Sequence, residues 1–163
     1  MRRSPRSPLR LRRPAGFAAL ASAALAVLAG AGCGESSDQV SEDELIARGD
    51  RICAEGQKRF AEVQAAAPPN AAVAAEQTEE LVQIATDSLN ELRNIQPPGD
   101  LRERYDAYLE ARARALELLE QGRNAAADED AESYVRAQVR AAAEQKQRLR
   151  LARAVGFEVC SQG

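Results

Sequence analysis

Beyond residue 40, apolar residues recur every three or four positions, which is the spacing of one face of an α-helix. Just before the first such segment, Ser41 and Glu44 have the spacing of a capping box, in which each satisfies a backbone N–H of the other. The pattern predicts a helix over 41–67, and two glycines on its apolar face favour close approach by another helix. That face comprises Ile46, Gly49, Cys53, Gly56, Phe60, Val63 and Ala67.

Three breaks divide the rest of the chain. Proline pairs at 68–69 and 97–98 stop a helix, and the stretch 122–127 is small and polar. Asp100 is suited to begin the third helix, Gly122 to end it, and Gly156 to end the fourth. The remaining helices are therefore predicted over 70–96, 100–121 and 128–156.

Four long helices with short connections, and no alternating strand pattern, predict an all-α fold. The fold class is an antiparallel four-helix bundle with up-down-up-down topology. Charged residues four positions apart are expected to pair on its surface, at Glu55/Arg59, Glu110/Arg114 and Glu144/Arg148. The inner face of the fourth helix is expected to comprise Tyr134, Val135, Val139, Ala142, Leu149 and Ala152.

The N-terminal segment has a different pattern. Residues 1–14 are basic, and residues 15–32 contain no charge and end in small residues. A basic region followed by an apolar region and a small-residue exit is typical of a secretory signal.

Ala31-Gly32-Cys33 resembles the end of the lipobox of bacterial exported lipoproteins, although Gly30 stands where that family usually has leucine. The resemblance covers about the first 35 residues and implies cleavage before Cys33, whose thiol then carries acyl chains such as palmitate. It divides the chain into a signal peptide at 1–32, a lipidated cysteine and flexible tether at 33–40, and a helical domain at 41–163. The mature domain also resembles small helical lipoproteins of no assigned activity, although only the signal carries that resemblance.

Two alternatives stay open for this segment. Cleavage after Ala31 would give a secreted soluble protein with a free thiol, and an uncleaved segment would serve as an anchor helix. The chain has three cysteines, so an exported form has one that cannot pair within the chain, and lipidation of Cys33 would account for it.

The other two cysteines are predicted to form a disulfide. An up-down-up-down bundle places the first half of helix one and the end of helix four at the same end. Cys53 lies in the former and Cys160 just beyond the latter. A disulfide between them suits an oxidising, exported location. The alternative is two reduced, buried thiols.

Charge and composition narrow the function classes. The chain carries 22 basic and 25 acidic residues. The first 32 residues contain six arginines and no acid, so the remainder has 22 − 6 = 16 basic residues against 25 acidic ones, a net charge of −9. This disfavours nucleic acid as a partner. The absence of histidine excludes Ser-His-Asp and Cys-His catalysis, and we expect no cofactor and no metal.

One candidate ligand site stands out. Tyr105, Tyr108, Arg112 and Tyr134 would line a pocket between helices three and four, although tyrosines at helical spacing more commonly belong to a core. A second candidate site is the acidic run at 128–130, which would bind a hard cation. The run is explained more simply by the dipole of the helix that follows, whose N-terminus favours acidic residues.

The sequence thus favours a non-enzymatic lipoprotein of the cell envelope, anchored on the extracytoplasmic face of the membrane by a lipid on Cys33. Its acidic helical domain would act as an interaction or structural module among other envelope proteins. The alternatives are an extracytoplasmic module that binds a small ligand, a secreted helical protein, and an enzyme that uses carboxylates or tyrosine.

Overall fold

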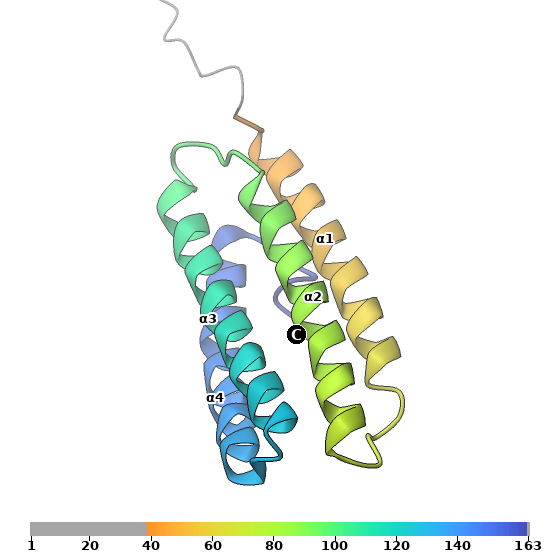
Figure 1. The fold of residues 1–163 in the computed structure, drawn as a ribbon. Helices are drawn as coiled ribbons and strands as arrows, with labels where there is room; N and C mark the ends of the chain where they lie inside the picture. The colour runs from red at the N-terminus through yellow and green to blue at the C-terminus, as the bar shows by residue number, and fades with distance from the viewer. Residues whose placement is uncertain (1–38, 163) are drawn as a thin grey trace, which may run out of the picture. The chain divides into compact units, whose positions relative to one another are not determined.

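The computed structural model describes residues 39–162, in which four helices form a bundle and no strand occurs. The helices are α1 (Glu42–Val63), α2 (Ala71–Arg93), α3 (Arg102–Ala127) and α4 (Ala131–Val155) (Figure 1). The predicted all-α fold is confirmed. The predicted signal peptide and Cys33 lie outside the described residues. Among the described helices, none is both long enough and apolar enough to cross a membrane.

Successive helices run in opposite directions, so the predicted up-down-up-down topology is also confirmed (Figure 1). Each helix packs on the next one in the chain, whereas α1 and α4 make few direct contacts. The segment after α4 turns back toward α1 and bonds to it through the backbone of residues 158–160. The ring of helices is therefore closed at one end by the C-terminal segment.

Side-chain caps fix the beginnings of three helices. Ser41 Oγ accepts the N–H of Glu44 at 3.2 Å, which is one half of the predicted capping box. The Glu44 carboxylate pairs with Arg48. Asn70 and Asp130 cap α2 and α4 as Ser41 caps α1. The hydrogen bonds of Asp130 with Ser133 hold the pKa of that carboxyl below its usual range. These caps therefore set the residue at which each of the three helices begins.

Two predictions about α3 are wrong. Asp100 does not cap it, since Leu101 occupies the cap position with no side-chain hydrogen bond. Gly122 does not end it, because the helix continues to Ala127 and Gly122 is buried inside it. A Cβ at Gly122 would lie 3.8 Å from the Cβ of Ala137, so this glycine faces α4 rather than terminating α3.

The predicted inner face of α4 is also wrong in part. Val135 and Val139 are 58% and 64% exposed, and Ala142 is exposed as well. Ala137, Ala152 and Val155 are the buried residues of the helix instead. The helix thus buries few side chains and turns two valines outward.

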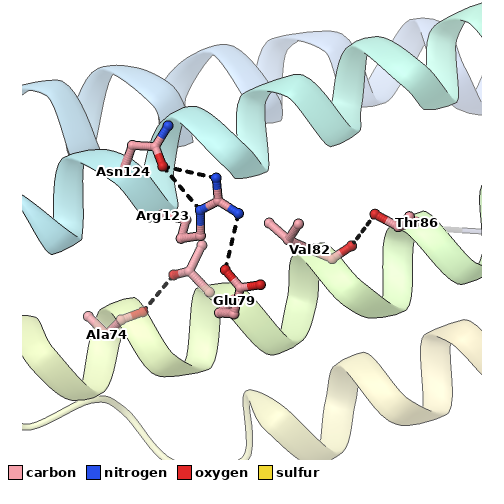
Figure 2. A network of polar contacts seen from close by, with 7 residues as sticks. Ala74, Glu79, Val82, Thr86, Arg123 and Asn124 are labelled. Atoms are coloured by element: carbon pink, nitrogen blue, oxygen red, sulfur yellow. Dashed lines mark hydrogen bonds and ion pairs between the residues drawn. The ribbon is translucent and has the colours of Figure 1, made fainter.

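A polar contact joins α2 and α3 (Figure 2). Arg123 of α3 donates to Glu79 of α2 at 3.1 Å and to its own neighbour Asn124. Nearby on α2, Thr86 Oγ1 donates to the carbonyl of Val82 at 2.8 Å. The Arg123–Glu79 pair is exposed, so it contributes little to stability.

Candidate functional site

Three aromatic side chains form the centre of the core at the disulfide end. The ring centroid of Phe157 lies 5.4 Å from that of Tyr108 and 6.2 Å from that of Tyr105. The Tyr105 hydroxyl donates to the Leu92 carbonyl at 2.6 Å, which satisfies the buried phenol. Burial raises the pKa of both tyrosines, because it disfavours the charged phenolate.

The predicted disulfide between Cys53 and Cys160 is confirmed. It joins α1 to the C-terminal segment with a Cα–Cα distance of 5.2 Å. The carboxylate of Asp50 accepts the backbone N–H groups of residues 158, 159 and 160 at 2.9 to 3.0 Å. The C-terminal segment is therefore held by a covalent bond and by three charged hydrogen bonds.

Gly49 makes this close approach possible. A Cβ at this position would lie 2.3 Å from Cε1 of Phe157. No side chain fits there unless the ring moves, which explains a glycine in the middle of an apolar helix face. We expected another helix to approach at this glycine, but the close neighbour is the Phe157 ring of the C-terminal segment.

A cavity of about 400 Å³ lies beside the disulfide and extends along the inside of the bundle. Its volume falls in the usual range of ligand pockets, about 300–1,000 Å³. All four helices contribute to it. It is lined by Cys53, Gly56, Gln57, Phe60, Ala61 and Gln64 of α1, Ala85 and Ser88 of α2, Arg112, Ala115, Leu116 and Leu119 of α3, Ala141, Gln145 and Arg148 of α4, and Cys160.

The cavity exists because the second half of α1 stands away from the core. The buried residues of α1 end at Cys53, and Gly56, Phe60 and Val63 are only half-buried. At Gly56 a Cβ would lie 3.0 Å from the Ser88 hydroxyl of α2, so α1 still contacts α2 there. The space opens toward α4, which α1 scarcely touches.

The charge of the cavity is positive. Arg112 and Arg148 line it, and no carboxylate is among its lining residues. Burial lowers the pKa of Arg148, and the positive charge of Arg112 lowers it further. Two guanidinium groups therefore belong to the lining of the same half-buried space.

The ion pairs on the surface show that Arg148 lacks its expected partner. Glu144 was expected to pair with Arg148 but lies 3.9 Å from Arg114 of α3 instead, so that prediction is wrong. Arg114 also contacts Glu110 at 4.0 Å, which confirms that pair. Arg59 pairs with Asp87 rather than with Glu55. No ion pair within residues 39–162 involves Arg112 or Arg148.

The predicted ligand-site residues come together only in part, because Tyr105, Tyr108 and Arg112 are neighbours and Tyr134 lies elsewhere. Tyr105 and Tyr108 are fully buried in the core, and of the four residues Arg112 alone is among the cavity residues. Tyr134 lies near Gly122, which is about 25 Å along α3 from Tyr105. Arg148 is the functional candidate that sequence reasoning missed.

Within residues 39–162, no group of three or more acidic or cysteine side chains is placed to hold a metal ion. In the acidic run at 128–130, Asp130 serves as the cap of α4 and Glu129 adopts a left-handed conformation. The simpler interpretation of this run, as the beginning of a helix, accounts for its role in the structure.

Comparison of the chain with protein families, curated proteins and solved structures found no match. The arrangement itself provides hydrogen-bond donors beside apolar surface, which is the chemistry of a binding site.

Proposed function

We propose that this protein is a lipid-anchored component of the cell envelope, with its four-helix domain on the extracytoplasmic face of the membrane. The domain acts there as a non-enzymatic interaction or structural module. The observation that carries the proposal is the Cys53–Cys160 disulfide, because such bonds persist in oxidising compartments and are rare in the cytosol.

The disulfide also bears on the third cysteine. It uses two of the three thiols of the chain, so Cys33 has no partner left within the chain. A lipid on Cys33 accounts for this thiol, and acylation with two or more chains gives stable membrane binding. The seven residues between Cys33 and Ser41 would then form a tether that reaches about 15 Å as a flexible coil.

Fractionation of cells that express the full chain tests the anchor. Wild-type protein is expected in the membrane fraction, with incorporated palmitate and a mass that corresponds to cleavage before Cys33. The Cys33→Ala variant is expected to lose the label and to leave the membrane or stay unprocessed. Ser36→Ala, in the same segment, is the matched control and keeps both properties.

Each other result has a definite meaning. If Cys33→Ala stays in the membrane as a processed protein, the lipid anchor is wrong. Unlabelled wild-type protein in the soluble fraction, cut after Ala31, would support the secreted alternative.

A second candidate function is binding of a small ligand, which the cavity beside the disulfide favours. This site differs from the tyrosine-lined pocket predicted from the sequence, because Arg112 and Arg148 line it together with apolar side chains. It is compatible with an anchored domain, because the cavity lies inside the bundle.

A further inference from the structure

The cavity has a charged end and an apolar end. Arg112 and Arg148 lie one or two helical turns away from the apolar residues Leu116, Leu119 and Ala141 on the same two helices. Arg148 is seven residues from Ala141, a rise of about 10 Å along α4. Cys53 and Cys160 belong to the lining as well, and they place the disulfide at one end of the space.

α1 contributes only uncharged residues to the lining. The lining residues from Cys53 to Gln64 span eleven positions, or about 16 Å of helix. Phe60 lies between them and is half-buried. The space is thus longer than a single headgroup needs, and its far part is bounded mainly by aliphatic and aromatic carbon.

Within residues 39–162, the two arginines form no ion pair with a carboxylate. The Tyr108 hydroxyl lies beside Arg112, but it is a neutral phenol and does not balance the charge. Two like charges that share a half-buried space repel each other and cost solvation. An anion between them removes both penalties and gains charge-assisted hydrogen bonds.

We propose that the cavity binds an amphipathic anion, which has one carboxylate or phosphate headgroup and one linear apolar chain. The headgroup lies between Arg112 and Arg148, and the chain extends past Leu116 toward Phe60 and Leu119. The proposal rests on the second candidate function given above, and it does not depend on the lipid anchor.

The route into the cavity follows from the helix packing. α1 and α4 are consecutive around the bundle but make few direct contacts, and both line the space. The C-terminal segment fills the gap between them only at the disulfide end. A chain-like molecule therefore enters along the part of the gap that lies beyond the disulfide.

Thermal unfolding of the full, oxidised chain tests the proposal with four probes. Octanoate and octyl phosphate are expected to raise the unfolding temperature as their concentration rises, because a ligand that binds only the folded state stabilises it. Octanol lacks the charge and acetate lacks the chain, so each is expected to give a much smaller shift. Comparing the first two probes identifies the preferred headgroup.

Variants then assign the effect to the cavity. Arg112→Gln with Arg148→Gln is expected to weaken octanoate binding by about tenfold or more, as for loss of hydrogen bonds to a charged group. Arg114→Gln is the matched control, since Arg114 is on the same helix but pairs with surface carboxylates. It is expected to bind octanoate like the wild type.

A third variant covers the case in which the double arginine variant does not fold. Leu116→Trp fills the apolar part of the cavity and leaves both arginines in place, and it is expected to abolish the shift with octanoate. The proposal is overturned if neither anionic probe stabilises the wild type, or if octanol equals octanoate in the wild type. Equal octanoate binding by a folded Leu116→Trp variant would also overturn it. None of these results affects the test of membrane anchoring by Cys33.

Discussion

The two halves of α1 share one helix but have different surroundings. Up to Cys53 the helix is fixed against aromatic rings, the disulfide and the C-terminal segment, and Leu45, Gly49, Ile52 and Cys53 are buried. Beyond Cys53 no residue of α1 is buried, and the side chains that face inward line a cavity. The comparison shows that a regular helix pattern predicts which side chains face inward but not how tightly they are packed.

The largest expected effect concerns the disulfide, which fixes the first half only. The double variant Cys53→Ala/Cys160→Ala is expected to lose about 4–5 kcal/mol in the free energy of unfolding, because the bond closes a long loop. The loop spans 107 residues. Denaturant unfolding of the variant and the oxidised wild type measures the difference. A loss below about 1 kcal/mol would mean that Asp50 and Phe157 hold the segment without the covalent bond.

The same substitution at two phenylalanines compares the two halves directly. Phe157→Ala is expected to lose about 3–5 kcal/mol, as a fully buried ring leaves a cavity. Phe60→Ala is expected to lose less than about 1.5 kcal/mol, because its ring is half-exposed and already borders an empty space. Denaturant unfolding of both variants measures the contrast. Equal losses would show that the second half of α1 is as tightly packed as the first.

Asp50 offers a smaller effect within the first half. Asp50→Ala is expected to cost about 2–3 kcal/mol, because three backbone N–H groups of the C-terminal segment lose their charged acceptor. Amide hydrogen exchange at residues 158–160 is expected to rise by a large factor. The control is Asp87→Ala, which removes an exposed carboxylate beside the second half and is expected to cost less than about 1 kcal/mol.

The smallest expected effect is a loss of stability at high pH. The pKa of Tyr105 is raised in the folded state above its unfolded value of about 10. The stabilisation from the neutral phenol is therefore complete below about pH 10 and is lost as the pH rises above that value. Tyr105→Phe is expected to cost about 1 kcal/mol at neutral pH through the lost bond to Leu92, and to lose less stability on going to alkaline pH. Unfolding curves at both pH values test this, and an unchanged alkaline loss would contradict it.

Much of the fold follows from local signals. The proline pairs, the caps at Ser41 and Asp130 and the glycine at 156 separate four helices, and the topology then brings Cys53 and Cys160 together. These signals work because each is a property of a few adjacent residues.

The errors concern contacts between helices. Glycine often ends a helix, but Gly122 lies inside α3, where it faces Ala137 of α4. Val135 and Val139 are apolar but exposed, whereas Ala137, Ala152 and Val155 are buried, and hydrophobic spacing alone does not distinguish the two sets.

The candidate site was predicted less well than the fold. Arg112 lies close to the apolar face of its helix in the sequence, and the structure places it on the cavity. The sequence does not mark Arg148 as a site residue, because Glu144 four residues earlier is its expected partner. In the structure Glu144 pairs with Arg114 instead. The cavity itself depends on the separation of α1 from α4, which no single segment of the chain encodes.

The bonds from Asp50 to residues 158–160 have a consequence for the order of synthesis. The N-terminal helix gains its last hydrogen bonds, its aromatic neighbour and its covalent partner from residues made more than a hundred positions later. During synthesis, Cys53 of α1 therefore stays a free thiol until Cys160 has been made. Residues made first therefore cannot complete the fold on their own. A chain truncated before Cys160 lacks the disulfide that holds α1 in place.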